Sequence, residues 1–264
     1  LLVFLNLFFQ KKLAYIVIGG FLPELLKRTP FYIRLVNKFD SIFVQTQHLK
    51  SDLETIGIRN VHILSNLKRL NTRDPGEIIL NNSPNIKLCV FSRLNKEKGI
   101  EDAIEAIKLT NQKLGGNYVS MDCYGLVPET YKKCFNELLK QNKSLIEYKG
   151  IVHYNKTVET LKNYFALLFP TYYYGEGFPG NVVDAYNSGL PIIATNWLYN
   201  SDVIKDGVNG ILVPIKNPDA ICDAILKLYY DRELAVRFGL NNLEAAKEYQ
   251  PDKVLRELYD FIDA

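Results

Sequence analysis

The chain has 264 residues, of which 47% are hydrophobic and 23% are charged. This balance is typical of a soluble globular protein with one large or two ordinary domains, and it excludes a disordered or fibrous chain. The net charge of +3 is unevenly spread, because residues 1–73 carry +7 and residues 74–264 carry −4. The basic first part indicates a face for anionic lipid or for a phosphorylated acceptor, with a solvated basic surface as the alternative.

The amino end is apolar over Leu1–Phe9, a run too short to span a bilayer at about 20 residues per helix. We interpret it as the end of an interior helix and expect an N-terminally truncated chain. The four cysteines lack CxxC spacing, which indicates reduced thiols, and the three histidines are too scattered for a metal site. We therefore expect a cytoplasmic protein, with peripheral contact at the inner face of the membrane left open.

The first part of the chain alternates apolar strands with a helical pattern. Strands are expected at residues 14–18, 41–46 and 61–65. Between the last two, Leu49, Leu53 and Ile56 fall at helical spacing, so this part predicts parallel βαβ units. Residues 70–84 are polar and rich in turn residues, which predicts an interdomain linker.

A second and fuller α/β series follows the linker. Its strands are expected at residues 86–91, 118–124, 145–151, 165–170, 190–194 and 210–213. Asn217-Pro218 is typical of a helix start, and a last helix is expected from Pro251. Six strands make a complete doubly wound sheet, whereas the first part has about half of one. The sequence therefore predicts an α/β protein of two domains, the first only partly present.

Candidate binding residues follow the expected strands, where open α/β sheets bind ligands. The loop after residues 86–91 carries Arg93 and Lys98 and leads into a helix. Two cations and free N–H groups could converge there on a diphosphate, with solvated side chains as the alternative. Gly125 follows the next strand, where a glycine could let a ligand approach the backbone closely.

The run of residues 176–185 is the most informative, because Glu176 and Asp184 flank a Gly/Pro turn between a strand and a helix. This layout directs backbone N–H groups and the positive end of the helix dipole toward a ligand. Asp184 shares a helix face with Asn181 and could accept hydrogen bonds from vicinal hydroxyls, as on a ribose. A capped helix with a solvated aspartate is the alternative.

Together these motifs resemble the retaining glycosyltransferases of family 4, which have the two-domain B-type fold with Rossmann-like domains. The resemblance covers most of residues 85–215 and rests on Arg93-Leu94, Lys98-Gly99, Glu176-Gly177-Phe178-Pro179, Asp184 and the runs 188–195 and 206–210. Residues 18–24 are similar to members that build bacterial capsules, O-antigens or exopolysaccharides.

The resemblance implies a retaining hexosyltransferase that moves a sugar from a UDP- or GDP-linked donor to a glycan or lipid-linked acceptor. Residues 1–75 would be the carboxyl half of the acceptor-side domain, 76–247 the donor-binding domain and 248–264 the helix that crosses back to the first. No metal, cofactor or nucleic acid is implied.

The resemblance also implies roles for individual residues. Arg93 and Lys98 would neutralise the diphosphate, Glu176 would contact the sugar hydroxyls, and Asp184 would hold the ribose. The rest of the donor site would come from Gly125, Phe178, Pro179, Gly180 and Asn181. Two departures stand out: the family commonly has Glu where this chain has Asp184, and often a histidine where this chain has Ile18-Gly19-Gly20.

Two other interpretations stay open. One is an epimerase or phosphorylase of the same B-type fold, although the chain shows neither the extra acid and histidine candidates of the first nor the lysine-bound cofactor signal of the second. The other is a nucleotide-sugar-binding module without transfer activity.

Overall fold

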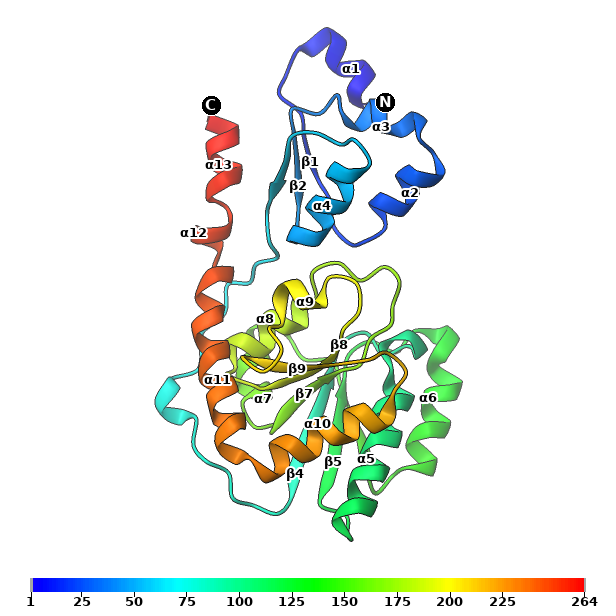
Figure 1. Ribbon diagram of the computed structural model, residues 1–264, viewed down its shortest axis with the longest axis vertical. Helices are drawn as coiled ribbons and strands as arrows, with labels where there is room; N and C mark the ends of the chain where they lie inside the picture. Colours follow the sequence, from blue (N-terminus) through cyan, green and yellow to red (C-terminus); the bar gives the residue numbers. More distant parts are fainter. Residues whose placement is uncertain (1, 264) are drawn as a thin grey trace.

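The computed structural model describes residues 2–263, and the strands within this range form two parallel sheets (Figure 1). The first has the order β1-β2-β3 and the second the order β6-β5-β4-β7-β8-β9. The second order is that of a complete doubly wound sheet, in which the order of the strands along the sheet reverses between β4 and β7. The predicted α/β class with parallel sheets is confirmed.

The first sheet consists of short strands at the predicted places, β1 (Ala14–Ile16), β2 (Ser41–Val44) and β3 (Val61–Ile63). Its helices are α1 (Leu2–Phe9), α2 (Leu22–Arg28), α3 (Phe31–Val36) and α4 (Gln47–Thr55). Helix α4 begins after Thr46, whose hydroxyl accepts a hydrogen bond from the Leu49 N–H. Helices α2 and α3 were not predicted, because their seven and six residues are too few to show a clear helical period.

The second sheet confirms all six predicted strands: β4 (Ile86–Phe91), β5 (Val119–Tyr124), β6 (Ile146–Gly150), β7 (Ala166–Phe169), β8 (Ile192–Thr195) and β9 (Gly210–Val213). Its helices are α5 (Ile100–Leu114), α6 (Glu129–Gln141), α7 (Thr157–Leu161), α8 (Gly180–Asn187), α9 (Asn200–Val203) and α10 (Pro218–Tyr230). As predicted, Asn217 caps α10, because its side chain accepts from the Ala220 N–H.

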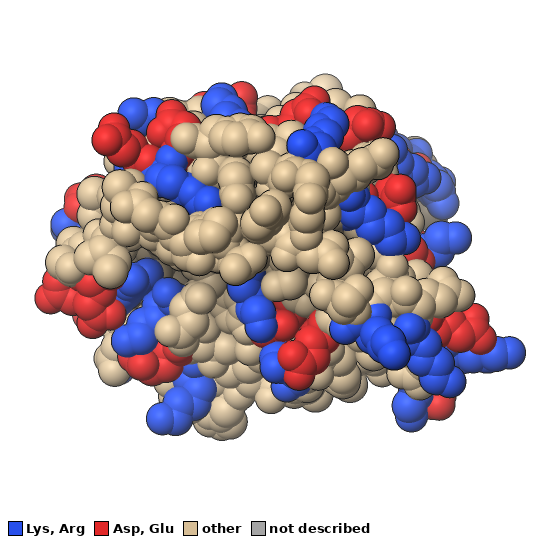
Figure 2. All heavy atoms as spheres, turned by 90° about the horizontal axis from the view of Figure 1, so that it is seen from below, with Lys and Arg blue, Asp and Glu red and all other residues tan. Residues whose placement is uncertain are grey.

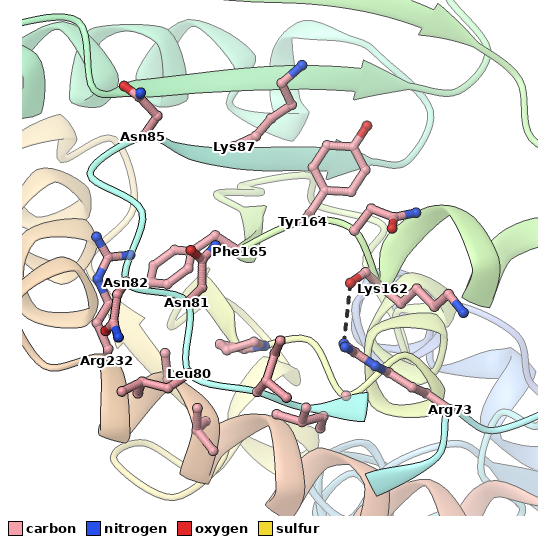
Figure 3. Close-up of a pocket in the computed structure, with 17 residues that line it drawn as sticks. Arg73, Leu80, Asn81, Asn82, Asn85, Lys87, Lys162, Tyr164, Phe165 and Arg232 are labelled. Atoms are coloured by element: carbon pink, nitrogen blue, oxygen red, sulfur yellow. Dashed lines mark hydrogen bonds between the residues drawn. The ribbon is translucent and has the colours of Figure 1, made fainter. Parts of the chain in front are cut away.

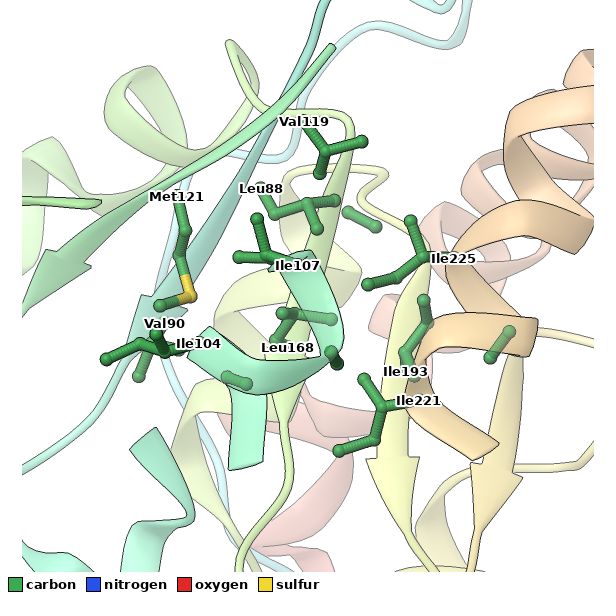
Figure 4. Packing of buried hydrophobic residues seen from close by; sticks show 14 of the residues in the cluster. Leu88, Val90, Ile104, Ile107, Val119, Met121, Leu168, Ile193, Ile221 and Ile225 are labelled. Atoms are coloured by element: carbon green, nitrogen blue, oxygen red, sulfur yellow. The ribbon is translucent and has the colours of Figure 1, made fainter. Parts of the chain in front are cut away.

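Helices cover both faces of the second sheet. On one face, Leu88 and Leu168 of the sheet meet Ile104 and Ile107 of α5 and Ile225 of α10 (Figure 4). On the other face, α8 packs against β7 and β8. Buried apolar surface stabilises the fold by about 25 cal/mol per Å². Because both faces are closed, the sheet is open to ligands at its edges and at the ends of its strands.

The carboxyl end of the chain returns to the first sheet. It comprises α11 (Arg232–Ala246), α12 (Pro251–Val254) and α13 (Arg256–Asp263), which run along one side of the molecule (Figure 1). Val254 joins Phe43 and Leu64 in a buried cluster, and Leu258 and Phe261 pack against it. Helix α11 was not predicted, and the helix predicted from Pro251 is interrupted at Leu255.

Candidate functional site

A cavity of about 320 Å³ lies at the carboxyl ends of β4, β5 and β6, beside the point where the strand order reverses. Its wall also includes the amino end of α8 and one residue from the loop after β3. The lining residues are Lys68, Phe91, Ser92, Lys98, Tyr124, Gly125, Ile151, Val152, Glu176, Pro179, Gly180, Asn181 and Asp184. Seven predicted site residues therefore meet at one cavity, although they come from three separate parts of the sequence.

Lys98 and Glu176 form an ion pair in the cavity wall. Lys98 Nζ lies 2.6 Å from Glu176 Oε2, and the side chains are only 12% and 9% exposed. The Thr171 hydroxyl donates to the same carboxylate oxygen at 2.9 Å. Lys98 Nζ also lies 5.4 Å from the ring centre of Phe169 and 5.2 Å from that of Tyr173. These contacts hold an acid and a cation side by side at the end of β7.

Asp184 forms a second ion pair, with Lys68 from the loop after β3. Lys68 Nζ lies 2.5 Å from Asp184 Oδ2. Asp184 is 2% exposed, and this burial raises the pKa of its carboxyl group, an effect that the charge of Lys68 partly offsets. Among the described residues, Asp184 Oδ1 and the nearby Asn181 Nδ2 are buried without a hydrogen-bond partner. The cavity wall therefore contains a hydrogen-bond acceptor and a hydrogen-bond donor, one helical turn apart, that have no partners among the described residues.

Two predicted residues do not belong to the lining that the structure describes for this cavity. Arg93 is exposed, and its guanidinium group forms no ion pair within residues 2–263. It follows Ser92, which does line the cavity. Phe178 is buried and packs against Tyr249 at 5.1 Å between ring centres, so its side chain supports the turn.

Gly125 brings the chain into close backbone contact beside the cavity. Its φ angle is +132°, and a Cβ atom added there would lie 1.8 Å from the Ser92 carbonyl oxygen. A side chain at this position would therefore displace the loop that leads to Lys98. The close neighbour of Gly125 in this structure is the protein's own backbone, and the approach of a ligand there stays a prediction.

The two sheets meet at a second close backbone contact. A Cβ atom added to Gly20, after β1, would lie 2.4 Å from the Glu176 carbonyl oxygen. A Cβ atom added to Gly177 would lie 2.6 Å from the Cα atom of Gly19. The turn with Gly19 and Gly20 therefore lies directly against the loop that carries Glu176.

Asn66 fastens the loop after β3 to the same turn. Its Nδ2 donates to the Phe178 carbonyl oxygen at 3.3 Å. Replacing Asn66 with alanine removes this hydrogen bond and is expected to lower the free energy of unfolding by about 1 kcal/mol. Urea denaturation measures the change, and Asn82→Ala, at an exposed position outside the helices and strands, serves as the control. Equal stability of the two variants would contradict the expectation.

Another cavity, of about 450 Å³, lies at the amino ends of β4, β7 and β8, beneath the connector between the sheets (Figure 3). Three of its cationic side chains contact other parts of the protein. Arg73 donates to the Lys162 carbonyl at 3.3 Å, Lys162 pairs with Glu77 at 3.3 Å, and Arg232 lies over the Phe165 ring. Seen from below, the molecule shows Lys and Arg beside Asp and Glu, so this view has no patch of a single sign (Figure 2). No predicted site residue lines this cavity.

Residues 2–263 lack two kinds of feature. In this range, no group of three or more His, Cys, Asp or Glu side chains is arranged to hold a metal ion. None of the described helices is long and apolar enough to cross a membrane.

The sequence interpretation missed six lining residues, Lys68, Phe91, Ser92, Tyr124, Ile151 and Val152, and also Thr171, which contacts Glu176. Thr171 lies two residues after the end of β7 and could have been noticed as a polar residue near a strand end. No neighbouring residue in the sequence indicated that Lys68 belongs to the site, because its partner Asp184 is 116 residues away in the chain.

Comparisons with known proteins agree with this architecture. Residues 76–245 match the family of glycosyl transferases group 1. An uncharacterised glycosyltransferase of Methanocaldococcus jannaschii is 26% identical over 246 residues, which are 90% of this chain and 64% of the relative. A capsular polysaccharide biosynthesis glycosyltransferase, CapM of Staphylococcus aureus, is 26% identical over 174 residues, which are 66% of this chain and 44% of the relative.

The crystal structure of HepE from Anabaena, in complex with UDP and glucose, superposes with a TM-score of 0.79. It is 18% identical, and the match covers 99% of this chain and 74% of that one. This chain belongs to the glycosyl transferases group 1 family, which confirms the resemblance to family 4 enzymes of the B-type fold. It spans less than two thirds of the length of the curated relatives that it matches.

Proposed function

We propose that this chain forms the donor-binding part of a glycosyltransferase, which transfers a hexose from a nucleotide-sugar donor to an acceptor with retention of configuration. The observation that carries the proposal is the meeting of two lysine–carboxylate pairs, Lys98–Glu176 and Lys68–Asp184, at one cavity beside the switch point. Membership of the family and the UDP bound in HepE support it.

The chemistry needs a leaving group with stabilised negative charge. When the bond between the anomeric carbon and the diphosphate oxygen breaks, the nucleoside diphosphate leaves with the bonding electrons. Lys98, which is nearly buried, and Arg93 would stabilise this charge. Arg93 is exposed and follows a lining residue, so its flexible side chain can reach a bound diphosphate.

The carboxylates would hold the two ends of the donor. Glu176 would accept hydrogen bonds from the sugar hydroxyls, and Asp184 Oδ1, which is unfilled among the described residues, would accept from the ribose. The backbone N–H groups of Phe178, Gly180 and Asn181 lie at the amino end of α8, where negative charge is favoured. Pro179 has no N–H group to contribute.

The acceptor would be a glycan or a lipid-linked saccharide, as in the assembly of a bacterial surface polysaccharide. The similarity to CapM and the run of residues 18–24 support this part of the proposal. We further propose a cytoplasmic enzyme with peripheral contact to anionic lipid through the basic first part, which liposome sedimentation with and without anionic lipid would test.

A binding screen tests the proposed function. Isothermal titration calorimetry with UDP-, GDP- and ADP-linked sugars is expected to give a dissociation constant in the micromolar range for at least one of them. Release of the nucleoside diphosphate from the selected donor then measures turnover, and comparison of the product's anomeric configuration tests retention. Binding without turnover would favour a binding module. A chain that binds none of these compounds would contradict the proposal.

A further inference from the structure

Lys68 reaches the cavity from the first sheet, whereas the other charged residues of the lining belong to the second. Its backbone N–H donates to the Tyr249 carbonyl at 3.3 Å, so the backbone is fixed where the carboxyl-terminal segment crosses. Its side chain is 34% exposed. Because a lysine stem is flexible, the ammonium group can change partners while the backbone stays in place.

The charges that line the empty cavity are balanced. Lys98 is paired with Glu176 and Lys68 with Asp184, so each ammonium group already has a carboxylate. A bound donor would change both pairs, because its hydroxyl groups would donate to the carboxylates while its diphosphate adds negative charge. Charge-assisted contacts with the phosphate oxygens would then compete with the carboxylates for the ammonium groups.

Two polar atoms near Lys68 are available to a polar ligand. Asp184 Oδ1 and Asn181 Nδ2 are buried and lack partners within the part of the chain that the structure describes. Asp184 is more than nine-tenths buried and lines the cavity. A ligand that fills these atoms would lie beside the Lys68 ammonium group, which contacts the other oxygen of the same carboxylate.

We propose that Lys68 is a further cation of the donor site, which pairs with Asp184 while the cavity is empty and binds the diphosphate of the nucleotide sugar when it is filled. This inference rests on the proposed function and adds to it a residue from the first sheet. It follows that a bound donor is held by both sheets at once.

The test compares ligands with and without phosphate. Affinities for UDP and uridine are measured by calorimetry in Asp184→Asn and in the double variant Lys68→Met/Asp184→Asn; GDP and guanosine replace them if the screen selects a guanine nucleotide. The asparagine background is used because it leaves no buried carboxylate unpaired when Lys68 is removed. Thermal unfolding of each variant verifies that it is folded.

Loss of Lys68 is expected to weaken UDP binding about tenfold or more and to change uridine binding by less than about twofold, as for one charge-assisted phosphate contact. Lys68→Arg in the otherwise unchanged chain keeps the charge and is expected to retain UDP binding. Lys132→Met serves as the control, because this exposed lysine of α6 pairs with Glu129 away from the cavity.

Other results would overturn the inference. Unchanged or tighter UDP binding after loss of Lys68 would show that Lys68 does not bind the diphosphate. Equal losses for UDP and uridine would assign Lys68 a purely structural role. These outcomes leave the proposed function intact, whereas an unsubstituted chain that binds no nucleoside diphosphate would refute both.

Discussion

Replacing Lys98 with methionine is expected to slow turnover of the donor by about 100- to 1000-fold, as when one preorganised donor to a developing negative charge is lost. Affinity for the nucleoside diphosphate is expected to fall about tenfold or more. The physical reason is that Lys98 brings a nearly buried ammonium group to the cavity, where water screens its charge poorly. Calorimetry and release of the nucleoside diphosphate measure the two effects.

Lys96→Met is the matched control for this experiment. Lys96 lies in the same short turn, Lys96–Lys98, but its side chain is exposed and forms no ion pair with any residue in the described range. It is expected to bind and turn over the donor like the unsubstituted chain. If the two variants behaved alike, Lys98 would have no special role in the site.

Replacing Asp184 with asparagine is expected to have opposite effects on binding and stability. Affinity for the nucleoside is expected to fall about tenfold, because an amide oxygen is a weaker acceptor than a carboxylate. The free energy of unfolding at pH 8 is expected to rise by roughly 1 kcal/mol, because burial disfavours the charged form of Asp184 and the Lys68 side chain that loses its partner is 34% exposed to water. Calorimetry with uridine and urea denaturation measure the two quantities.

The gain in stability depends on pH with a definite sign. Burial raises the pKa of folded Asp184 above its ordinary value of 3.8. This carboxyl group therefore stabilises the fold below the unfolded pKa, and the contribution is lost as the pH rises through the folded pKa. The advantage of asparagine is expected to be largest at pH 7–8 and to shrink as the pH is lowered toward 4.

Asp223→Asn is the control for the pH series, because Asp223 is exposed on α10 and pairs with Lys113 away from the cavity. It is expected to change stability by less than about 0.5 kcal/mol at any pH. An Asp184→Asn variant that unfolds more readily at pH 8 than the unsubstituted chain would contradict this expectation. It would show that the attraction between Asp184 and Lys68 exceeds the free-energy cost of desolvating the Asp184 carboxylate.

The strands could be predicted because they are buried parallel strands, which appear in the sequence as short continuous apolar runs. The run Ile86–Phe91 became β4 without any change in its bounds. Helix α11 was missed even though it contains buried Leu234, Phe238 and Leu243, because polar residues and Gly239 interrupt its apolar pattern. The assignment of domains with bounds at residues 75 and 247 stays a prediction.

The site could be predicted only within the second sheet. Lys98, Glu176 and Asp184 follow strand ends, and the topology of a doubly wound sheet brings strand ends together. The pairing of Asp184 with Lys68 could not be predicted, because it depends on how the loop after β3 lies across α8. The roles assigned to Arg93, Lys98, Glu176 and Asp184 await the experiments above.

The contact between the glycine turn after β1 and the loop of Glu176 limits which substitutions the protein can accept there. Gly20 lies against the backbone of Glu176, and Gly177 lies against the backbone of Gly19. A methyl group added at either glycine would push these two backbone segments apart. A random mutagenesis survey is therefore expected to tolerate many substitutions in α2 and α3 and almost none at these two positions.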